Sequence, residues 1–147
     1  MQYDFLILGG SGMQGKITAR DLIENGHSVF LADLFDDGAK IIQAKFPDKD
    51  IPFERVNLLR QKPTTDLIRK VRPAVVINCA ESECNLTVYK ACLDAGVHVI
   101  DLGSSIPMTE KQIAMSPFFK EANLIAITGC GSTPGINNVA LHHAHTF

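Results

Sequence analysis

The stretch Leu8-Gly9-Gly10-Ser11-Gly12-Met13-Gln14-Gly15 has four glycines in eight residues. It follows a mostly apolar run, YDFLIL at residues 3–8, and precedes a mixed polar and apolar run, KITARDLIEN at residues 16–25. A turn without side chains between a strand and a helix lets an anionic ligand approach backbone N–H groups at the positive end of the helix dipole. This strand, turn and helix context is the one that a dinucleotide-binding fingerprint requires.

Residues 10–15 read as G-x-G-x-x-G, and each glycine has an expected role. Gly10 would allow a tight turn, Gly12 would let a pyrophosphate approach, and Gly15 would let the helix pack on the strand. We therefore expect cofactor contacts along the whole turn, from Gly10, Ser11, Gly12, Met13, Gln14 and Gly15. The alternative is a glycine-rich turn with no ligand.

Gly9, Gly12 and Gly15 also spell G-x-x-G-x-x-G, a spacing found in short-chain reductases and related regulatory domains. The register of the glycines does not choose between the two patterns. A catalytic short-chain reductase needs a Tyr-x-x-x-Lys pair, and neither Tyr3 nor Tyr89 has a lysine four residues further on. The sequence therefore argues against that enzyme class.

The composition describes one ordinary globular domain. The chain has 147 residues, a net charge of −2 and 46% apolar residues, which excludes a disordered tail and argues against a nucleic-acid binder. The first residues, MQYDF, lack the basic start of a secretion signal, and no apolar run approaches the ~18 residues that span a bilayer. We expect a cytoplasmic protein.

Short apolar runs alternate with amphipathic stretches along the chain. In the first stretch Gly15, Ala19, Leu22 and Ile23 share one helix face, and a glycine follows. This alternation predicts an α/β fold, a doubly wound parallel sheet of about six strands covered on both faces, of the Rossmann type. The expected strands are residues 3–8, 28–33, 52–57, 74–78, 98–102 and 124–128.

Asp33 ends the second expected strand, where such folds place the acid that accepts hydrogen bonds from the adenosine ribose. A 2′-phosphate there would meet a like charge, and the next residues, Leu34 and Phe35, include no arginine to receive it. NAD is therefore favoured over NADP. The alternatives are that Asp33 caps the following helix, or that Asp36 or Asp37 binds the ribose.

The cysteines and histidines suggest no metal or redox site. Because no Cys-x-x-Cys spacing occurs, we interpret Cys79, Cys84, Cys92 and Cys130 as reduced packing thiols. His142, His143 and His145 lie in the last expected helix without a nearby acid or cysteine to complete a metal site. We assign no metal.

Several segments together resemble the cofactor domain of the saccharopine dehydrogenase-like family. They are the glycine turn, Ile-Asn-Cys-Ala at 77–80, Ala-Gly at 95–96, Val-Ile-Asp-Leu at 99–102 and Pro-Gly-Ile-Asn at 134–137. The resemblance implies an NAD(P)-dependent oxidoreductase that oxidises or forms the C–N bond of an amino-acid conjugate or polyamine precursor by hydride transfer.

The resemblance also implies positions for the cofactor. The strand ends at 78–81 and 101–104 would surround the nicotinamide half, with Cys79, Ala80 and Gly103 as cofactor contacts. Asn57 and Leu58 would flank the adenine, and Leu34 would lie beside the ribose acid. It assigns no catalytic residue.

One departure from the family concerns the C-terminal part of the chain. Family members carry a second α/β domain after the segment matching 134–137, whereas this chain stops at Phe147. We interpret residues 1–147 as the dinucleotide-binding domain and 134–147 as the start of a connection to a substrate domain. Such a chain should bind dinucleotide, turn over an amine or amino-acid substrate poorly, and self-associate through the surface left exposed.

Some residues have competing interpretations. Glu81 and Asp101 could act as a general base or hold a substrate ammonium, but we favour a helix cap, a ribose contact or a solvated loop acid. Met115, Phe118 and Phe119 are expected in a helix packed across the sheet. For the whole domain, the alternatives are a non-catalytic dinucleotide sensor and a degenerate Rossmann domain retained for assembly.

Overall fold

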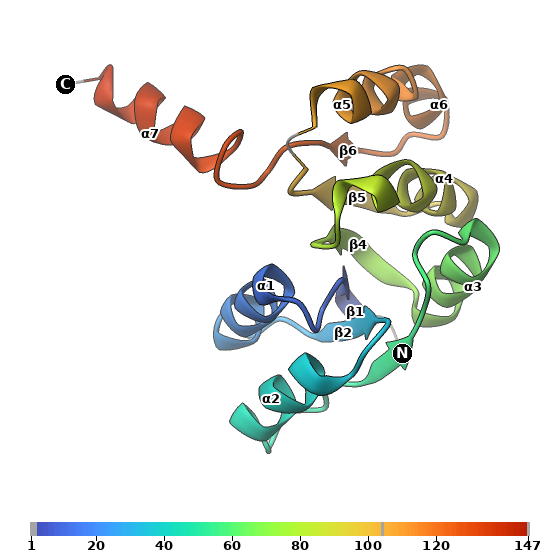
Figure 1. Ribbon diagram of the computed structural model, residues 1–147, viewed down its shortest axis with the longest axis vertical. Coiled ribbons are helices and arrows are strands. Elements are labelled where there is room, and N and C mark those ends of the chain that lie inside the picture. The colour runs from blue at the N-terminus through green and yellow to red at the C-terminus, as the bar shows by residue number, and fades with distance from the viewer. Residues whose placement is uncertain (1–2, 104, 147) are drawn as a thin grey trace.

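A computed structural model describes residues 3–103 and 105–146 of the chain. Its centre is a six-stranded parallel sheet with the strand order β3-β2-β1-β4-β5-β6 (Figure 1). This is the doubly wound order of dinucleotide-binding folds and confirms the predicted fold class. The strands are β1 Tyr3–Leu8, β2 Val29–Asp33, β3 Phe53–Arg55, β4 Pro73–Asn78, β5 His98–Asp101 and β6 Ala126–Ile127.

Helices connect the strands and cover both faces of the sheet (Figure 1). They are α1 Met13–Glu24, α2 Asp37–Lys45, α3 Gln61–Val71, the short 3₁₀ turn η1 Ser82–Cys84, α4 Asn85–Ala95, α5 Ile106–Ile113, α6 Ser116–Glu121 and α7 Ile136–Ala144. Gly96 ends α4 in the left-handed conformation, with φ 73°. Within residues 3–103 and 105–146, no helix has the length and apolar character needed to cross a bilayer.

The sheet separates two hydrophobic cores, because successive side chains of a strand point to opposite faces. Leu6 and Leu8 of β1 belong to the core that includes α3 and α4, whereas Ile7 belongs to the core that includes α1 and α2. In α1 the predicted stripe is inward, with Gly15, Ala19 and Ile23 buried. Parallel strands covered on both faces read as continuous apolar runs, as residues 5–8 of β1 and 73–77 of β4 do.

The two edge strands are shorter than predicted. β3 covers three residues and β6 only two, because each pairs with a neighbour on one side alone. The central strand β1 pairs on both sides and has the predicted bounds. Register follows from these pairs, and it places Asp33 opposite Arg55.

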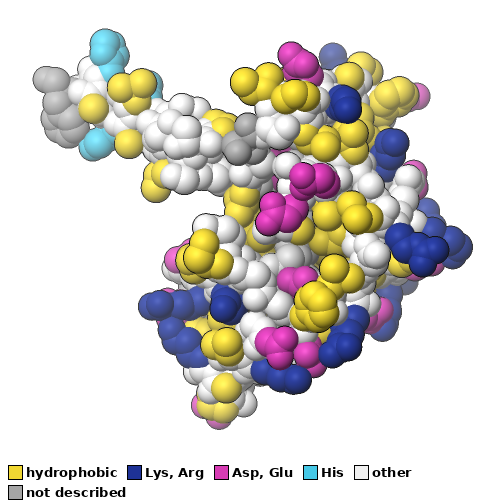
Figure 2. Space-filling view, in the orientation of Figure 1, with side chains coloured by type: hydrophobic (Ala, Val, Ile, Leu, Met, Phe, Trp, Pro, Cys, Tyr) yellow, Lys and Arg dark blue, Asp and Glu magenta, His cyan; other side chains and the backbone are white. Residues whose placement is uncertain are grey.

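Helix α7 stands off the body of the domain (Figures 1 and 2). It has no buried residue, and Ile136, Val139 and Leu141 are exposed. In α6, by contrast, Phe119 is buried against Tyr89 and Phe118 is exposed, so the expected helix packing holds for one of the two phenylalanines.

Candidate functional site

A cleft of about 650 Å³ lies at the carboxyl ends of β1, β2 and β4. The chain runs from β1 outward to β3, then returns to place β4 on the other side of β1. Ligands of doubly wound sheets bind at this point of reversal. The lining residues are Gly9, Gly12, Met13, Gln14, Asp33, Leu34, Val56, Asn57, Leu58, Leu59, Cys79, Ala80, Glu81, Glu83 and Cys84.

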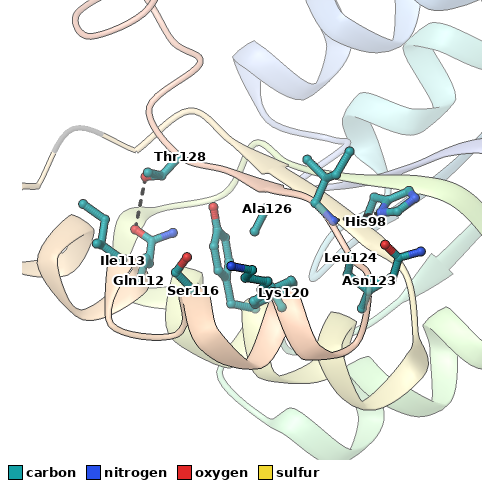
Figure 3. Close-up of a pocket in the computed structure, with 12 residues that line it drawn as sticks. His98, Gln112, Ile113, Ser116, Lys120, Asn123, Leu124, Ala126 and Thr128 are labelled. Carbon is teal, nitrogen blue, oxygen red and sulfur yellow. Dashed lines mark hydrogen bonds between the residues drawn. The ribbon is translucent and has the colours of Figure 1, made fainter.

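A second hollow, of about 750 Å³, lies beside the edge strand β6 and helices α5 and α6 (Figure 3). Its lining combines apolar side chains such as Leu124 and Ala126 with His98 and Lys120. It contains neither the glycine turn nor the helix N-terminus that follows it. We therefore place the candidate site in the first cleft, where backbone N–H groups and a carboxylate converge.

The glycine turn forms the anion-binding end of this cleft. Gly12 is the N-cap of α1 and has no side chain to cap it, and the next residues, Met13 and Gln14, are exposed. N–H groups in the first turn of a helix have no intrahelical acceptor, so they can bind a ligand anion. A Cβ at Gly12 would meet only Gly9 O, at 3.2 Å, so the turn is open on its cleft side.

Gly15 has the packing role predicted for it. A Cβ there would lie 2.1 Å from Gly9 O, so only glycine lets α1 start this close to the strand end. Gly10 lies in the turn as predicted, but the residue of the turn in the left-handed region is Gly9, with φ 72°. Gly10 instead donates its N–H to Ala32 O at 3.1 Å, which ties the turn to β2.

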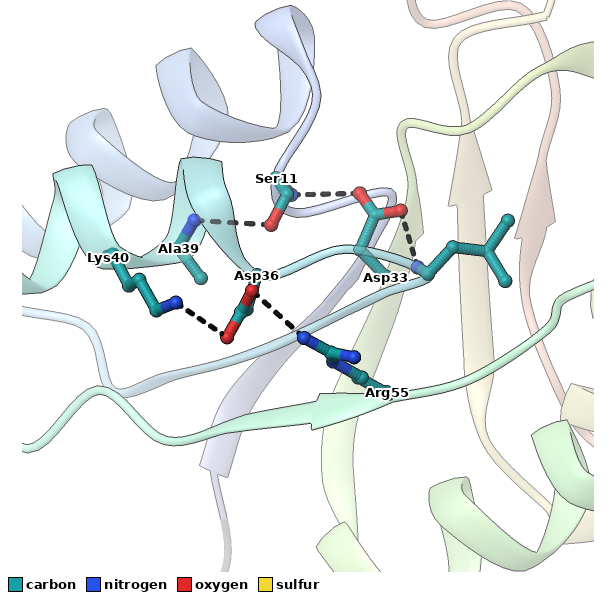
Figure 4. Close-up of polar contacts among 7 residues, drawn as sticks. Ser11, Asp33, Asp36, Ala39, Lys40 and Arg55 are labelled. Carbon is teal, nitrogen blue, oxygen red and sulfur yellow. Dashed lines mark hydrogen bonds and ion pairs between the residues drawn. The ribbon is translucent and has the colours of Figure 1, made fainter.

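Asp33 holds the glycine turn from the end of β2 (Figure 4). Its Oδ2 accepts a hydrogen bond of 2.9 Å from Ser11 N, and its Oδ1 accepts one of 2.7 Å from Leu34 N. The alternative in which Asp33 caps the next helix was wrong, because the N-cap residue of α2 is Asp36. The carboxylate remains partly exposed and lines the cleft.

Helix α2 is fixed directly to the glycine turn. Ser11 Oγ accepts a hydrogen bond of 3.1 Å from Ala39 N, and a Cβ at Gly38 would lie 2.0 Å from Ser11 O. Only a glycine at position 38 permits this approach. The turn and the start of α2 are thus in backbone contact.

An arginine lies on β3, the strand that pairs with β2, although the residues that follow Asp33 in the sequence include none. Arg55 is the register partner of Asp33, and its Nη2 is 3.1 Å from Asp36 Oδ1. Lys40 Nζ is 3.0 Å from the other oxygen, Asp36 Oδ2. Lys40 first, and Arg55 with it, lowers the pKa of Asp36.

The sequence-predicted site residues fall into three groups. Those that line the cleft are Gly12, Met13, Gln14, Asp33, Leu34, Asn57, Leu58, Cys79 and Ala80. Gly10, Ser11 and Gly15 belong to the turn but are not among the residues that line the cleft, and they pack against β1 and β2. Gly103 lies apart, after β5, where a Cβ would meet Asn85 Nδ2 at 2.5 Å.

The prediction missed several lining residues. Val56 and Leu59 flank the two predicted adenine neighbours, and their position beside a strand end could have suggested them. Glu83 and Cys84 come from η1, a short turn that no periodicity indicates. Glu81, for which a helix cap, a ribose contact or a solvated loop acid was favoured over a chemical role, is exposed, lines the cleft and is the N-cap residue of η1.

The thiols that line the cleft are not activated as nucleophiles. Burial raises the pKa of Cys79 to about 11, and its Sγ is 3.6 Å from Thr18 Oγ1. A thiol with a raised pKa is mostly protonated at neutral pH and therefore unreactive. The prediction of a packing role was wrong for Cys130, which is exposed in the loop after β6.

Asp101 corrects the interpretation favoured from the sequence. It is fully buried, so it is not a solvated loop acid, and it ends β5 while Ser105 is the N-cap of α5, so it is not a helix cap. Tyr89 Oη and Gln112 Nε2 donate to its Oδ2, each at 2.6 Å, and the N–H groups of Gly103 and Gly129 donate to its Oδ1 at 2.7 and 3.2 Å. Four donors from four segments join the loops that follow β5 and β6.

A model of the family described as the saccharopine dehydrogenase NADP binding domain matches residues 5–127. The chain belongs to this family. The match confirms the resemblance drawn from the glycine turn and the strand ends, although residues 134–137 lie beyond the matched range. The description of the saccharopine dehydrogenase NADP binding domain specifies NADP, whereas the sequence favoured NAD, so that preference stays a prediction.

Similar proteins are much longer than this member of the family. A carboxyaminopropylagmatine dehydrogenase of Synechocystis sp. is 25% identical over 147 aligned positions, and the match covers 95% of this chain and 37% of the relative. A carboxynorspermidine synthase of Vibrio cholerae is 28% identical over 110 residues, which are 68% of this chain and 27% of the relative. The chain thus spans little more than a third, or less, of these relatives.

A solved structure supports the fold. The saccharopine dehydrogenase (L-Glu forming) from Saccharomyces cerevisiae superposes with a TM-score of 0.75 at 17% identity, over 92% of this chain and 28% of that chain. At this identity the likeness concerns the fold. It agrees with the fold described above.

Proposed function

We propose that this domain binds a nicotinamide dinucleotide in the glycine cleft, with NAD preferred to NADP, as the cofactor domain of an oxidoreductase. One observation carries the proposal: the bare N-cap Gly12 opens the N-terminus of α1 onto a cleft that also contains the Asp33 carboxylate. Main-chain N–H groups would hold the pyrophosphate, and Asp33 would accept the ribose hydroxyl groups.

The residues at the strand ends fit the two halves of such a ligand. Val56, Asn57 and Leu58 line the cleft at the β3 side, where the adenine would lie. Cys79 and Ala80 line it after β4, on the side proposed for the nicotinamide. When bound, the cofactor supplies the hydride chemistry, and the residues of this domain orient it.

The proposed reaction class is the oxidation or formation of a C–N bond. The names of the two curated relatives, together with the family, support an amino-acid conjugate or a carboxylated polyamine precursor as the substrate class. The residues that line the cleft would hold the cofactor rather than this substrate. We therefore propose that residues 1–147 alone bind dinucleotide and turn over substrate poorly.

The test is a calorimetric titration of the chain with NADH and, separately, NADPH. We expect NADH to bind more tightly, and Asp33→Ala to weaken it by about ten-fold or more, since hydrogen bonds to a charged group contribute about 1.5–3 kcal/mol. Asp37→Ala removes an exposed acid of α2 and is the matched control. The proposal fails if neither nucleotide binds the folded chain, or if the control has the same effect.

Thermal unfolding of each variant separates lost binding from lost structure. Asp33 also accepts the Ser11 N–H, so its replacement loosens the turn as well as removing the ribose acceptor. Asp33→Asn keeps one acceptor oxygen and should retain part of the affinity for NADH. An affinity that is equal in Asp33→Asn, Asp33→Ala and the unchanged chain would contradict the role of this carboxylate.

A further inference from the structure

Four charged side chains gather where β2 ends and α2 begins, two acids and two bases (Figure 4). Asp33 faces the cleft and the glycine turn. On strand β3, Arg55 is its register partner, and the Val56 N–H donates to Asp33 O at 2.9 Å. Strand pairing therefore places the backbone of Arg55 beside that of the predicted ribose acid, although 22 positions separate the two residues in the numbering.

Asp36 forms ion pairs with both bases. One carboxylate oxygen is 3.1 Å from Arg55 and the other is 3.0 Å from Lys40. The side chains of Arg55 and Lys40 are each 66% exposed, whereas that of Asp36 is 26% exposed. Both bases thus have long, solvated side chains that can turn elsewhere, and the less exposed carboxylate holds them in place.

We propose that Asp36 is a positioning residue for cofactor choice, which disfavours NADP by keeping Arg55 and Lys40 engaged. This inference rests on the proposed dinucleotide binding and adds the source of its specificity. A 2′-phosphate carries about −1.5 to −2 charges and would lie next to the Asp33 carboxylate, so it needs a cation to offset the repulsion.

An arginine suits that task, because its planar fork binds phosphate oxygens in pairs. Arg55 is the arginine adjacent to Asp33, but Asp36 competes for it. NAD has a hydroxyl group in place of the phosphate and needs no cation there. Asp36 therefore affects the two cofactors differently without touching either of them.

The experiment uses Asp36→Asn, which has nearly the same shape and is also accepted at a helix N-cap. Calorimetric titrations with NADPH and NADH are made at low and at physiological ionic strength. We expect NADPH affinity to rise about ten-fold and NADH affinity to change less than about two-fold. The gain should shrink as salt increases, because the released cations are exposed.

Two further variants test whether the effect on cofactor preference is specific to Asp36 and depends on Arg55. Glu54→Gln removes an acid of β3 that pairs with Lys70, and it changes the net charge by the same amount as Asp36→Asn. It should leave the ratio of NADPH to NADH affinity unchanged. Adding Arg55→Gln to Asp36→Asn should abolish most of the gain.

The outcomes separate this inference from the proposed function. If NADH binds but Asp36→Asn leaves the ratio unchanged, or if Glu54→Gln shifts it equally, the role of Asp36 is refuted while dinucleotide binding stands. Tighter binding of NADPH than of NADH by the unchanged chain also refutes it, because the bases would then already serve the phosphate. If neither nucleotide binds any folded variant, the proposed function and this inference fall together. Asp36→Ser, another good N-cap residue, repeats the test should Asp36→Asn fold poorly.

Discussion

The hydroxyl group of Tyr89 donates a 2.6 Å hydrogen bond to Asp101 Oδ2, and both side chains are almost fully buried. This bond joins α4 to the end of β5 inside the larger core. Burial first, and then the Asp101 carboxylate, raises the pKa of Tyr89. A buried carboxylate without its donors is costly, so this arrangement carries much of the stability of the region.

Tyr89→Phe should lower the free energy of unfolding by about 1.5–3 kcal/mol, the range for a hydrogen bond to a charged group. Urea denaturation measures the change. Tyr3→Phe is the control, because Tyr3 is half-buried and packs edge-to-face on Phe30. Equal losses in the two variants would show that the bond to Asp101 adds nothing specific. Asp101→Asn, which turns an amide N–H₂ toward donors, should cost more than Tyr89→Phe.

Gly12 and Gly15 should respond differently to alanine. Gly15→Ala places a methyl group 2.1 Å from Gly9 O, so we expect a loss of about 3 kcal/mol in unfolding free energy. Gly12→Ala meets only Gly9 O, at 3.2 Å, and should lose less than about 1 kcal/mol. Its methyl group would nevertheless occupy the approach of the pyrophosphate and weaken NADH by about ten-fold or more. A Gly12→Ala variant with normal affinity would contradict the proposed position of the pyrophosphate.

The four thiols should react in order of exposure. Cys130 is exposed, Cys79 and Cys84 are half-buried, and Cys92 is buried. With a disulfide reagent at pH 8 we expect one fast thiol, which Cys130→Ser removes, and a slow Cys92 that reacts only as the chain unfolds. Bound dinucleotide should slow Cys79 and Cys84, which line the cleft, and leave Cys130 unaffected. Protection of Cys130 instead would place the ligand elsewhere.

Stability should fall at alkaline pH. Burial raises the pKa of Cys79 from 9.0 to about 11 in the folded chain. The unfolded state therefore releases the proton first, and stability is lost as pH rises through the interval from 9.0 to about 11, at up to about 1.4 kcal/mol per pH unit. Burial raises the pKa of Cys92 as well, so both thiols act in the same direction.

Urea denaturation between pH 7.5 and 10 measures this slope. Cys79→Ala should make it shallower, since one group with a raised pKa is removed. Cys130→Ala is the comparison, because that thiol is exposed and should contribute less. Identical slopes in the two variants would contradict the assignment to Cys79.

The sequence predicted the parts of the fold that local pattern determines. Residues 5–8 of β1 are apolar because helices cover both faces of the sheet there, and position 15 in the first turn of α1 is glycine because a side chain there would collide with Gly9 O. The edge strands were predicted too long, because apolar content alone does not reveal that a strand pairs on one side. Residues 124–128 are apolar, yet only Ala126–Ile127 form β6.

The remaining features depend on residues that lie far apart in the chain. Arg55 lies beside Asp33 through strand register, which no feature of residues 33–37 indicates. Asp101 was expected as a helix cap, a ribose contact or a solvated loop acid, because its donors, among them Tyr89 and Gln112, come from helices whose packing the sequence does not reveal. Cys130 follows an apolar segment but lies in a loop, so its burial was overestimated.

Because Gly38 and Ser11 are in backbone contact, the side chains of the turn at residues 34–37 can be replaced without displacing the turn. This turn is held at one end by the Asp33 carboxylate on the Ser11 N–H and at the other by the approach of Gly38 to Ser11 O. Side chains within it can vary without moving the glycine turn, provided that position 38 stays glycine. A library randomised at residues 34–37 should therefore yield folded domains with altered cofactor selectivity, whereas one that includes position 38 should return glycine there in nearly every stable clone.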